Sequence, residues 1–228
     1  MTLRPSPYTG ELIGKALKPA IRTRDLVAMP PHSLVRVAKK PLRLDDEVQF
    51  IRSWIEKPLS IGAVMPSSKV LARTMARYVD PALSGPVIEL GPGTGPVTEA
   101  MVQHGVDPAR LILVEFNPDF CRLLRTRYPA ATVVQGDAYR LRRLLETYVK
   151  EPATAIVSGL PLVTKPVRTR LRLISDAMAL LAPGAPFVQF TYAMVTPIPK
   201  ALTGIKAQAS ELIWMNVPPA RVWVYRGA

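Results

Sequence analysis

A glycine-rich turn follows a short apolar segment that contains an acidic residue. The apolar segment is Val87–Leu90 with Glu89 inside it, and the turn is Gly91-Pro92-Gly93-Thr94-Gly95. Glycines at this spacing allow unusual backbone angles and let a ligand approach the main chain, which is typical of a turn that holds a nucleoside. A dinucleotide-binding fingerprint would place glycine at position 96, where this chain has Pro96. The turn by itself therefore leaves the ligand open.

Polar residues recur at the ends of three further apolar segments. Glu115 stands 24 residues after Gly91, Asp137 follows 22 residues later, and Ser158 follows after another 21. If these segments are parallel strands, the polar groups meet along one crevice at the carboxyl ends of the strands. An acid at the second strand suits a bidentate grip on ribose hydroxyls, and Asp137 followed by the small Ala138 suits an adenine amino group. The alternative is that Glu115 and Asp137 only cap loops.

Alternating strands and helices must position these groups. We expect strands at 87–90, 111–115, 132–135, 155–157 and 187–192, and helices from about 96, from about 118, near 140–149 and over 167–181. A closing hairpin is expected over 211–226, with Pro218-Pro219 at its turn. This order predicts an α/β fold: a doubly wound, Rossmann-like, mostly parallel sheet with a C-terminal antiparallel hairpin and an N-terminal helical extension.

Positive charge is concentrated at the start of the chain. The 228 residues carry a net charge of +13, and nine basic against two acidic residues give residues 1–44 a charge of +7. Such a balance predicts a polyanionic partner, either nucleic acid or an anionic membrane surface. Ile13, Leu17 and Ile21 recur at helical spacing within it. Residues 1–44 are therefore either a solvated tail or a basic amphipathic extension that docks on anionic lipid.

The composition of the sequence changes at Asp45, which we take as the start of a second domain over residues 45–228. Within it, residues 45–83 are expected to form helices that cover the site. The first is predicted to be capped by Asp46 and to end before Pro58, and the second to be capped by Ser67 or Ser68 and to reach about Val79. Through the N-terminus of that second helix, the two serines are candidates to approach an anionic group of a ligand.

Two further features bear on the compartment. Cys121 is the single cysteine, so no internal disulfide can form; this favours a reducing compartment, and its apolar setting predicts a buried, inert thiol. Residues 177–199 lack charge over a length that resembles a membrane span, but three prolines and a Pro-Gly pair interrupt them. We therefore expect a helix end, a turn and a strand there, and no segment that crosses a bilayer.

Together these motifs resemble class I S-adenosylmethionine-dependent methyltransferases over about residues 84–228. The likeness rests on Glu89–Gly95, Glu115, Gly136–Ala138, Ser158–Pro161 and Leu180–Gly184. It implies an enzyme that uses S-adenosyl-L-methionine, releases S-adenosyl-L-homocysteine and needs no metal, because an in-line methyl transfer depends mainly on positioning.

The same resemblance assigns roles to individual residues. It implies that the glycine turn holds the methionine part of the cofactor, Glu115 the ribose and Asp137 the adenine. The implied cofactor-binding residues are Glu89, Gly91, Pro92, Gly93, Thr94, Gly95, Glu115, Asn117, Asp137, Ala138, Ser158, Gly159, Leu160, Ser67 and Ser68.

Two subfamilies resemble the chain in this way but methylate different acceptors. Ribosomal RNA adenine dimethyltransferases carry Asn-Leu-Pro followed by an aromatic residue that stacks on a flipped base. This chain has Ser158 and Leu162 at those places, and both departures disfavour base methylation. RNA adenine N6-dimethylation is kept as the alternative function, and an inactive lipid-binding scaffold as a non-enzymatic one.

Bacterial phospholipid N-methyltransferases, which make phosphatidylcholine from phosphatidylethanolamine, are the second subfamily. The runs Phe50–Pro58 and Ile61–Ser68 resemble their N-terminal signature, extending the likeness to about residues 45–228. It implies methylation of phosphatidylethanolamine, in up to three steps, by a cytoplasmic enzyme bound peripherally to the inner face of the cell membrane. The partners would be an anionic phospholipid surface and the lipid substrate, with nucleic acid disfavoured.

Five residues are candidates for the acceptor side of such a site. Glu56 is a candidate base, since the acceptor amine must lose a proton, but it could equally be a solvated helix acid. Trp54 and Tyr192 could line the site, since ring faces favour methylated ammonium groups, or simply pack in the core. Lys165 and Arg168 could meet a lipid phosphate or form a solvated helix start.

Overall fold

The computed structural model describes residues 66–192, 195–199, 204–216 and 219–227, with the side chains of residues 66–68 excepted. The chain divides into two units, Met1–Lys40 and Pro41–Ala228, and only the second contains described residues. The predictions for the 1–44 extension, and for Trp54 and Glu56, lie outside the described residues and stay predictions.

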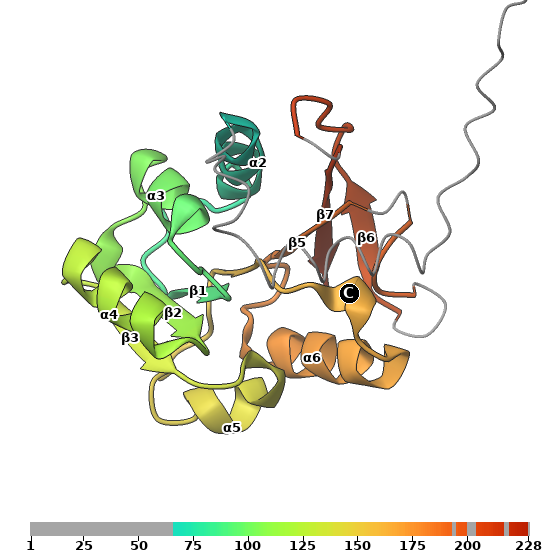
Figure 1. The fold of residues 1–228 in the computed structure, drawn as a ribbon. Helices are drawn as coiled ribbons and strands as arrows, with labels where there is room; N and C mark the ends of the chain where they lie inside the picture. The colour runs from blue at the N-terminus through green and yellow to red at the C-terminus, as the bar shows by residue number, and fades with distance from the viewer. Residues whose placement is uncertain (1–65, 193–194, 200–203, 217–218, 228) are drawn as a thin grey trace, which may run out of the picture. The chain divides into compact units, whose positions relative to one another are not determined.

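A sheet of seven strands forms the centre of the described fold, in the order β3-β2-β1-β4-β5-β7-β6 (Figure 1). The first five strands run parallel, whereas β7 is antiparallel to β5 and β6 is antiparallel to β7. The strand order reverses between β1 and β4, which places a ligand crevice outside the carboxyl ends of these strands. The strands are β1 (Val87–Leu90), β2 (Leu111–Glu115), β3 (Thr132–Gln135), β4 (Ala155–Ser158), β5 (Phe187–Thr191), β6 (Lys206–Ala209) and β7 (Arg221–Arg226).

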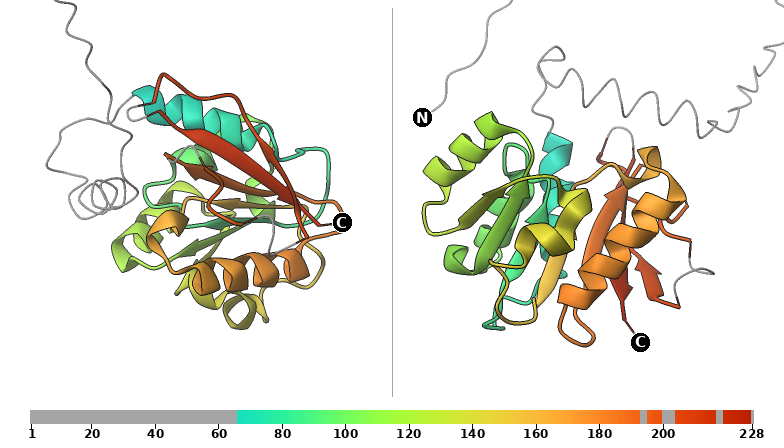
Figure 2. Two further views of the ribbon diagram at one scale, coloured as in Figure 1. Left: turned by 90° about the vertical axis from the view of Figure 1, so that its right-hand side faces the viewer. Right: turned by 90° about the horizontal axis from the view of Figure 1, so that it is seen from below.

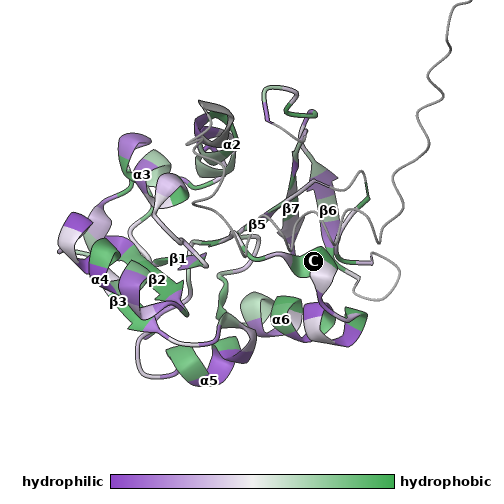
Figure 3. Ribbon diagram, in the orientation of Figure 1, coloured by the Kyte–Doolittle hydropathy of each residue, from purple (hydrophilic) through white to green (hydrophobic). Residues whose placement is uncertain are grey.

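Helices cover both faces of the sheet. The helices α2 (Pro66–Ala76), α3 (Pro96–Gln103) and α4 (Pro118–Arg127) contribute to one hydrophobic cluster, and α5 (Leu141–Leu145) and α6 (Val167–Leu180) to the other. Figure 3 shows hydrophobic residues along β2 and alternating hydrophobic and hydrophilic stretches along α5 and α6, as expected for helices with one buried face. Short 3-10 turns lie at η1 (Pro108–Arg110), η2 (Ala138–Arg140) and η3 (Leu162–Thr164).

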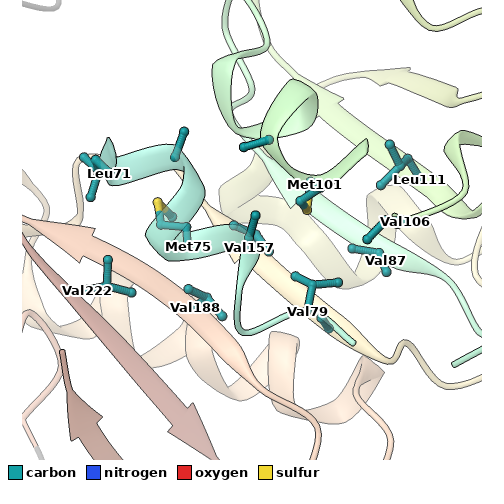
Figure 4. Packing of buried hydrophobic residues seen from close by; sticks show 14 of the residues in the cluster. Leu71, Met75, Val79, Val87, Met101, Val106, Leu111, Val157, Val188 and Val222 are labelled. Carbon is teal, nitrogen blue, oxygen red and sulfur yellow. The ribbon is translucent and has the colours of Figure 1, made fainter. Parts of the chain in front are cut away.

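The central strands are buried on both faces, which explains their nearly continuous apolar sequences. Val87 of β1 belongs to the cluster under α2 and α3, while its neighbour Ile88 belongs to the cluster under α5 and α6. Figure 4 shows Leu71 and Met75 of α2 beside strand residues of the first cluster. Helices packed on both faces hold the strands in place, and with them the carboxyl edge of the sheet, where Glu115, Asp137 and Ser158 lie.

The predicted fold class is confirmed, and most predicted strands agree closely with the structure. The hairpin begins earlier than predicted: its first strand, β6, lies at Lys206–Ala209, before the predicted 211–226. Within the predicted range Ile213 pairs with Ala220, so the chain turns between these two residues. The reason is that β6 is an edge strand with three of its four residues exposed, so it has no buried face to leave a hydrophobic pattern.

Two helix predictions also need correction. The helix expected near 140–149 ends at Leu145, after a 3-10 turn that begins at Ala138. Helix α2 begins at Pro66, which is favoured at a first helical position, so Ser67 and Ser68 lie inside its first turn and do not precede it as caps. Among the described residues no helix is long and apolar enough to span a membrane, and 177–199 contains the end of α6, the Gly184 turn and β5.

Candidate functional site

The glycine turn after β1 has a backbone that side chains would disfavour. Gly91, Gly93 and Gly95 have φ values of 69°, 57° and 87°, in the left-handed region. A Cβ on Gly91 would lie 3.0 Å from Leu160, whereas one on Gly93 would meet nothing within 4 Å. The Gly91 amide donates to the Val114 carbonyl, which ties the turn to β2. The turn is therefore packed at its start and open at Gly93, where a ligand can approach the main chain.

Glu115 holds this turn in place. Its Oε2 accepts the Gly93 amide at 2.9 Å and its Oε1 accepts the Asn117 amide at 2.8 Å, with the residue 8% exposed. A carboxylate offers about four acceptor positions. Two are used here, so each oxygen retains capacity for a hydroxyl of a bound ligand. The predicted ribose contact therefore fits the geometry, together with a second role in shaping the turn.

Glu89 lies under the same turn and is only 2% exposed. The Thr98 hydroxyl donates to its Oε2 at 2.6 Å. Burial raises the pKa of Glu89 to about 7, the Thr98 hydrogen bond opposes this rise, and the charge of Glu115 adds to it. Near neutral pH the carboxyl is therefore balanced between two protonation states, and a ligand ammonium group would favour the charged state.

Asp137 begins the turn after β3. Its Oδ1 accepts the Tyr139 amide at 2.9 Å, while Oδ2 is 4.0 Å from the exposed Arg140 side chain. The Gly136 amide donates to the Glu115 backbone carbonyl at 2.9 Å, so this turn is joined to the end of β2. The structure thus places Asp137 and Glu115 at the same edge of the sheet, with one Asp137 oxygen free of backbone hydrogen bonds to the described residues.

The segment Ser158–Pro161 is held between the glycine turn and β5. The Gly159 amide donates to the Leu90 carbonyl at 2.8 Å, and a Cβ on Gly159 would lie 2.8 Å from the Gly91 carbonyl oxygen. The side-chain Nε2 of Gln189 donates to the Leu160 carbonyl at 2.9 Å. Only glycine fits between these backbones. The hydrogen bond from the Gln189 side chain holds the segment against β5.

The acceptor-side candidates are less closely grouped. The Tyr192 ring packs edge-on against Phe190 with centroids 5.5 Å apart, and a hydrogen bond with Asn216 partly offsets the rise that burial causes in the Tyr192 pKa. The Lys165 ammonium lies 4.9 Å from the centroid of the Tyr139 ring. Arg168 is exposed on the first turn of α6. Side chains of Ser67 and Ser68, with all of Trp54 and Glu56, lie outside the described residues.

Sequence reasoning did not identify three residues that shape the site. Thr98 is a buried polar residue on the inner face of α3, and Gln189 interrupts an apolar strand; both departures from the hydrophobic pattern were available signals. Phe116 directly follows Glu115 and is 74% exposed, which offers a flat apolar surface beside that acid. The sequence does not show this exposure, because it depends on how the described elements pack around Phe116.

A separate hollow of about 190 Å³ lies between α2 and α3, outside the crevice. It includes Thr94 of the glycine turn but none of Glu89, Glu115 and Asp137, so it flanks the turn and does not coincide with the strand-edge residues. Within the described ranges, no three His, Cys, Asp or Glu side chains are grouped closely enough to hold a metal ion.

The crevice combines an open main-chain turn, a bidentate acid and a second acid one strand further along. These groups offer a polar ligand hydrogen-bond partners on the main chain and on two carboxylates along one edge of the sheet. Transfer of a group between two bound molecules in such a crevice depends on their alignment.

Comparisons with known proteins agree with this chemistry. No family model matches the chain. An ornithine lipid N-methyltransferase of Singulisphaera acidiphila is 34% identical over 151 residues, which is 65% of this chain and 79% of that protein. A ribosomal RNA small subunit methyltransferase A of a Synechococcus strain is 33% identical over 96 residues, but the match spans 41% of this chain and only 31% of that protein.

Solved structures share the fold at low sequence identity. TrmN from Thermus thermophilus superposes with a TM-score of 0.58 at 18% identity, covering 72% of this chain and 52% of TrmN. The N-methyltransferase NodS from Bradyrhizobium japonicum gives 0.57 at 14% identity, covering 71% of this chain and 97% of NodS. NodS in complex with S-adenosyl-L-homocysteine gives 0.54 at 14% identity, covering 81% of this chain and 96% of NodS.

Proposed function

The chain belongs to the class I S-adenosylmethionine-dependent methyltransferases, and from that membership we propose that it methylates a primary amine in the headgroup of a membrane lipid. The cofactor predicted from the sequence, S-adenosyl-L-methionine, is confirmed by the family. The observation that carries the lipid proposal is the match to most of a lipid N-methyltransferase at 34% identity. The ribosomal RNA relatives match less than a third of their own length.

The residues present fit the cofactor. We propose that the Gly91–Gly95 turn and Glu89 hold its methionine part, Glu115 its ribose hydroxyls and Asp137 its adenine amino group. Three observations support this: the open space at Gly93, the unused acceptor capacity of Glu115, and the uncommitted Oδ2 of Asp137. The pKa of about 7 for Glu89 adds a fourth, because a bound ammonium would draw this carboxyl into its charged form.

The bound cofactor supplies an electrophilic methyl group on a sulfonium. With the cofactor bound, the amine lone pair would form a nitrogen–carbon bond as the sulfur–carbon bond breaks and leaves its electron pair on sulfur. The chain must therefore bring a neutral amine in line with that bond and exclude water. The clamped segment Ser158–Pro161 lies beside the glycine turn and is suited to this orientation. Glu56 is the proposed proton acceptor, and Tyr192 is proposed to line the acceptor site.

Phosphatidylethanolamine is the proposed acceptor. The runs Phe50–Pro58 and Ile61–Ser68 support it through their resemblance to phospholipid N-methyltransferases. Leu162 is 2% exposed within the hydrophobic core, so it offers no surface on which a flipped base could stack. An ornithine lipid is the second candidate acceptor, because the relative that matches most of the chain is named for it. Both lipids present an amine, so the same site chemistry applies.

The test uses the full chain with methyl-labelled cofactor and four acceptors presented separately. They are phosphatidylethanolamine vesicles, ornithine lipid vesicles, phosphatidylglycerol vesicles and ribosomal RNA. Label in phosphatidylethanolamine is expected, and chromatography of the products gives the number of methyl groups. Label in ornithine lipid alone would replace the acceptor, and label in RNA but in no lipid would overturn the proposal. Glu89→Ala should abolish the signal, with Glu99→Ala, an exposed acid on α3, as the matched control.

Docking on an anionic membrane is proposed to depend on residues 1–44, whose charge of +7 supports it. Each basic residue near an anionic surface contributes about 1 kcal/mol, and salt screens that attraction. Flotation with vesicles that contain phosphatidylglycerol should therefore weaken strongly as salt rises toward about 1 M. Flotation that does not respond to salt would contradict an electrostatic attachment. The inner face of the cell membrane is the proposed location.

A further inference from the structure

Exposed apolar side chains gather on segments that leave the carboxyl ends of the parallel strands. Among the described residues, eight large hydrophobic side chains are exposed, and five of them follow β2, β4 or β5 or lie between β6 and β7. Leu83 and Tyr148 lie instead in connections at the opposite, amino-terminal edge, and Leu123 lies on α4. The five are Phe116, Val167, Val195, Trp214 and Met215, exposed by 74%, 37%, 58%, 74% and 72%.

The connection from β6 to β7 lies at this carboxyl edge because of the strand directions. Thr191, the last residue of β5, pairs with Arg221, the first residue of β7. β6 is antiparallel to β7, so it ends where β5 ends. In the right-hand view of Figure 2, the start of α6 and the β6–β7 connection lie toward the same edge of the sheet. Trp214 and Met215 are therefore carried at the edge where the cofactor crevice opens.

Residues 213–216 of this connection are anchored at both ends. The Ile213 amide donates to the Ala220 carbonyl at 2.8 Å, and Ile213 is buried in the same cluster as Leu71 of α2. Asn216 is 5% exposed and is hydrogen-bonded with Tyr192. Trp214 and Met215 lie between these two anchored positions, so their exposure follows from the backbone that Ile213 and Asn216 fix.

Positive charge accompanies these apolar residues. The stretch 152–175, which includes the start of α6, contains four basic residues and no acidic one. Arg170 donates to the Pro197 carbonyl at 2.6 Å, which ties the first turn of α6 to the segment that carries Val195. Arg168 is exposed, and Glu211 is the acid that opposes this charge in the described part of the hairpin connection. Apolar residues beside an excess of basic ones match an anionic lipid surface.

We propose that the β6–β7 hairpin tip inserts into the lipid surface. Trp214 and Met215 enter the boundary between headgroups and acyl chains, where an indole ring is favoured at a membrane interface, and Lys165 and Arg168 meet anionic headgroups. The carboxyl edge of the sheet then faces the bilayer, and a headgroup amine reaches the crevice while its acyl chains stay in the membrane. This inference rests on the proposed lipid substrate and adds the surface by which the enzyme faces it.

The experiment compares three variants of the full chain. Trp214→Ser with Met215→Ser removes the apolar tip, and Leu83→Ser with Tyr148→Ser removes two exposed apolar residues at the opposite edge. Trp214→Phe keeps an aromatic ring at the tip but removes its indole, so the difference in emission between wild type and Trp214→Phe reports Trp214 apart from Trp54 and Trp223. Each variant is measured by vesicle partitioning, by tryptophan emission, and by methylation of two forms of phosphatidylethanolamine. One form is mixed with phosphatidylglycerol in vesicles, and the other is a short-chain lipid dissolved as monomers.

The double serine change at the tip should lower partitioning, and vesicle methylation with it, roughly tenfold, because burying two large apolar side chains even partly is worth about that factor in an equilibrium constant. Methylation of the monomeric lipid should stay unchanged. The variant at the opposite edge should behave as the wild type in every assay. Vesicles should shift the Trp214 emission, taken as the difference between wild type and Trp214→Phe, to shorter wavelength, and Trp214→Phe should keep partitioning.

Three results would overturn the inference. Partitioning of the tip variant equal to that of the wild type would show that the tip does not enter lipid. An equal loss with monomeric lipid would make the tip part of the substrate pocket. A Trp214 emission already shifted without vesicles would show that another part of the chain or a second copy covers it. Should the wild type methylate no lipid at all, the proposed function fails, and partitioning and emission still decide the inference.

Discussion

Replacing Thr98 by valine tests whether the ionisation of Glu89 governs cofactor binding. The Thr98 side chain is fully buried, and its hydroxyl donates to the Glu89 carboxyl at 2.6 Å. Valine keeps the shape and removes the donor. A hydrogen bond to a charged group is worth about 1.5–3 kcal/mol, and part of it persists when the acid is neutral, so the pKa of Glu89 should rise by about 1.

The expected loss of affinity follows from that rise. With a pKa of about 7, about half of the Glu89 carboxyls are charged near pH 7. After a rise of about 1, roughly a tenth are charged, so binding of the cofactor's ammonium group should weaken about fivefold near pH 7. The affinities of Thr98→Val and the wild type should converge as the pH rises toward about 9, because Glu89 is then charged in both proteins and the ligand's amine loses its proton alike in both. Titration calorimetry with S-adenosyl-L-homocysteine across this range measures the midpoint of each pH profile.

The matched control is Thr74→Val on α2, where the hydroxyl donates only to the Val70 carbonyl of its own helix. This variant should keep the wild-type pH profile. Coincident profiles for Thr98→Val and the wild type would refute the reasoning, since Glu89 would then not report on the bound ammonium. Loss of affinity at every pH by the same factor would indicate a packing defect instead.

Glu89 should also make stability depend on pH: its folded-state pKa lies above the ordinary 4.5, so its contribution is fully present below about 4.5 and is lost as the pH rises through about 7, which denaturation by urea at several pH values would measure. Glu115→Gln should weaken the cofactor at least about tenfold in calorimetry, because its amide donor would face one of the two backbone amides that the carboxylate accepts, whereas exposed Glu99→Gln should have no effect. Gly159→Ala should destabilise by about 2 kcal/mol more than Gly227→Ala in urea denaturation, since its Cβ would lie 2.8 Å from the Gly91 carbonyl oxygen while that of Gly227 meets nothing within 4 Å; equal losses would contradict this packing. Cys121 is completely buried, and burial raises the pKa of its thiol, so a thiol reagent should modify it only after unfolding; rapid modification of the folded chain would disprove its inertness.

Local sequence pattern determined the parallel core of this protein. Strands buried on both faces, such as β1 and β2, require continuous apolar runs, and glycine turns and helix starts limit them at both ends. The spacing from Gly91 to Glu115 and Asp137 then placed their side chains at one edge, because parallel strands end together. Each strand and turn is set by residues adjacent in the chain, and the shared edge follows from the general rule for parallel strands, so the sequence sufficed for both.

Tertiary structure alone decided how these groups are tied together. The Gly93 amide meets Glu115 across 22 residues, and Gln189 reaches the Leu160 carbonyl across 29. Such contacts depend on the register of neighbouring strands, which no single segment specifies. The edge strand β6 and the exposure of Trp214 are further examples, since whether a residue is buried depends on what the rest of the fold brings against it. Apolar pattern predicts burial, and only the packed structure shows where an apolar side chain is left uncovered.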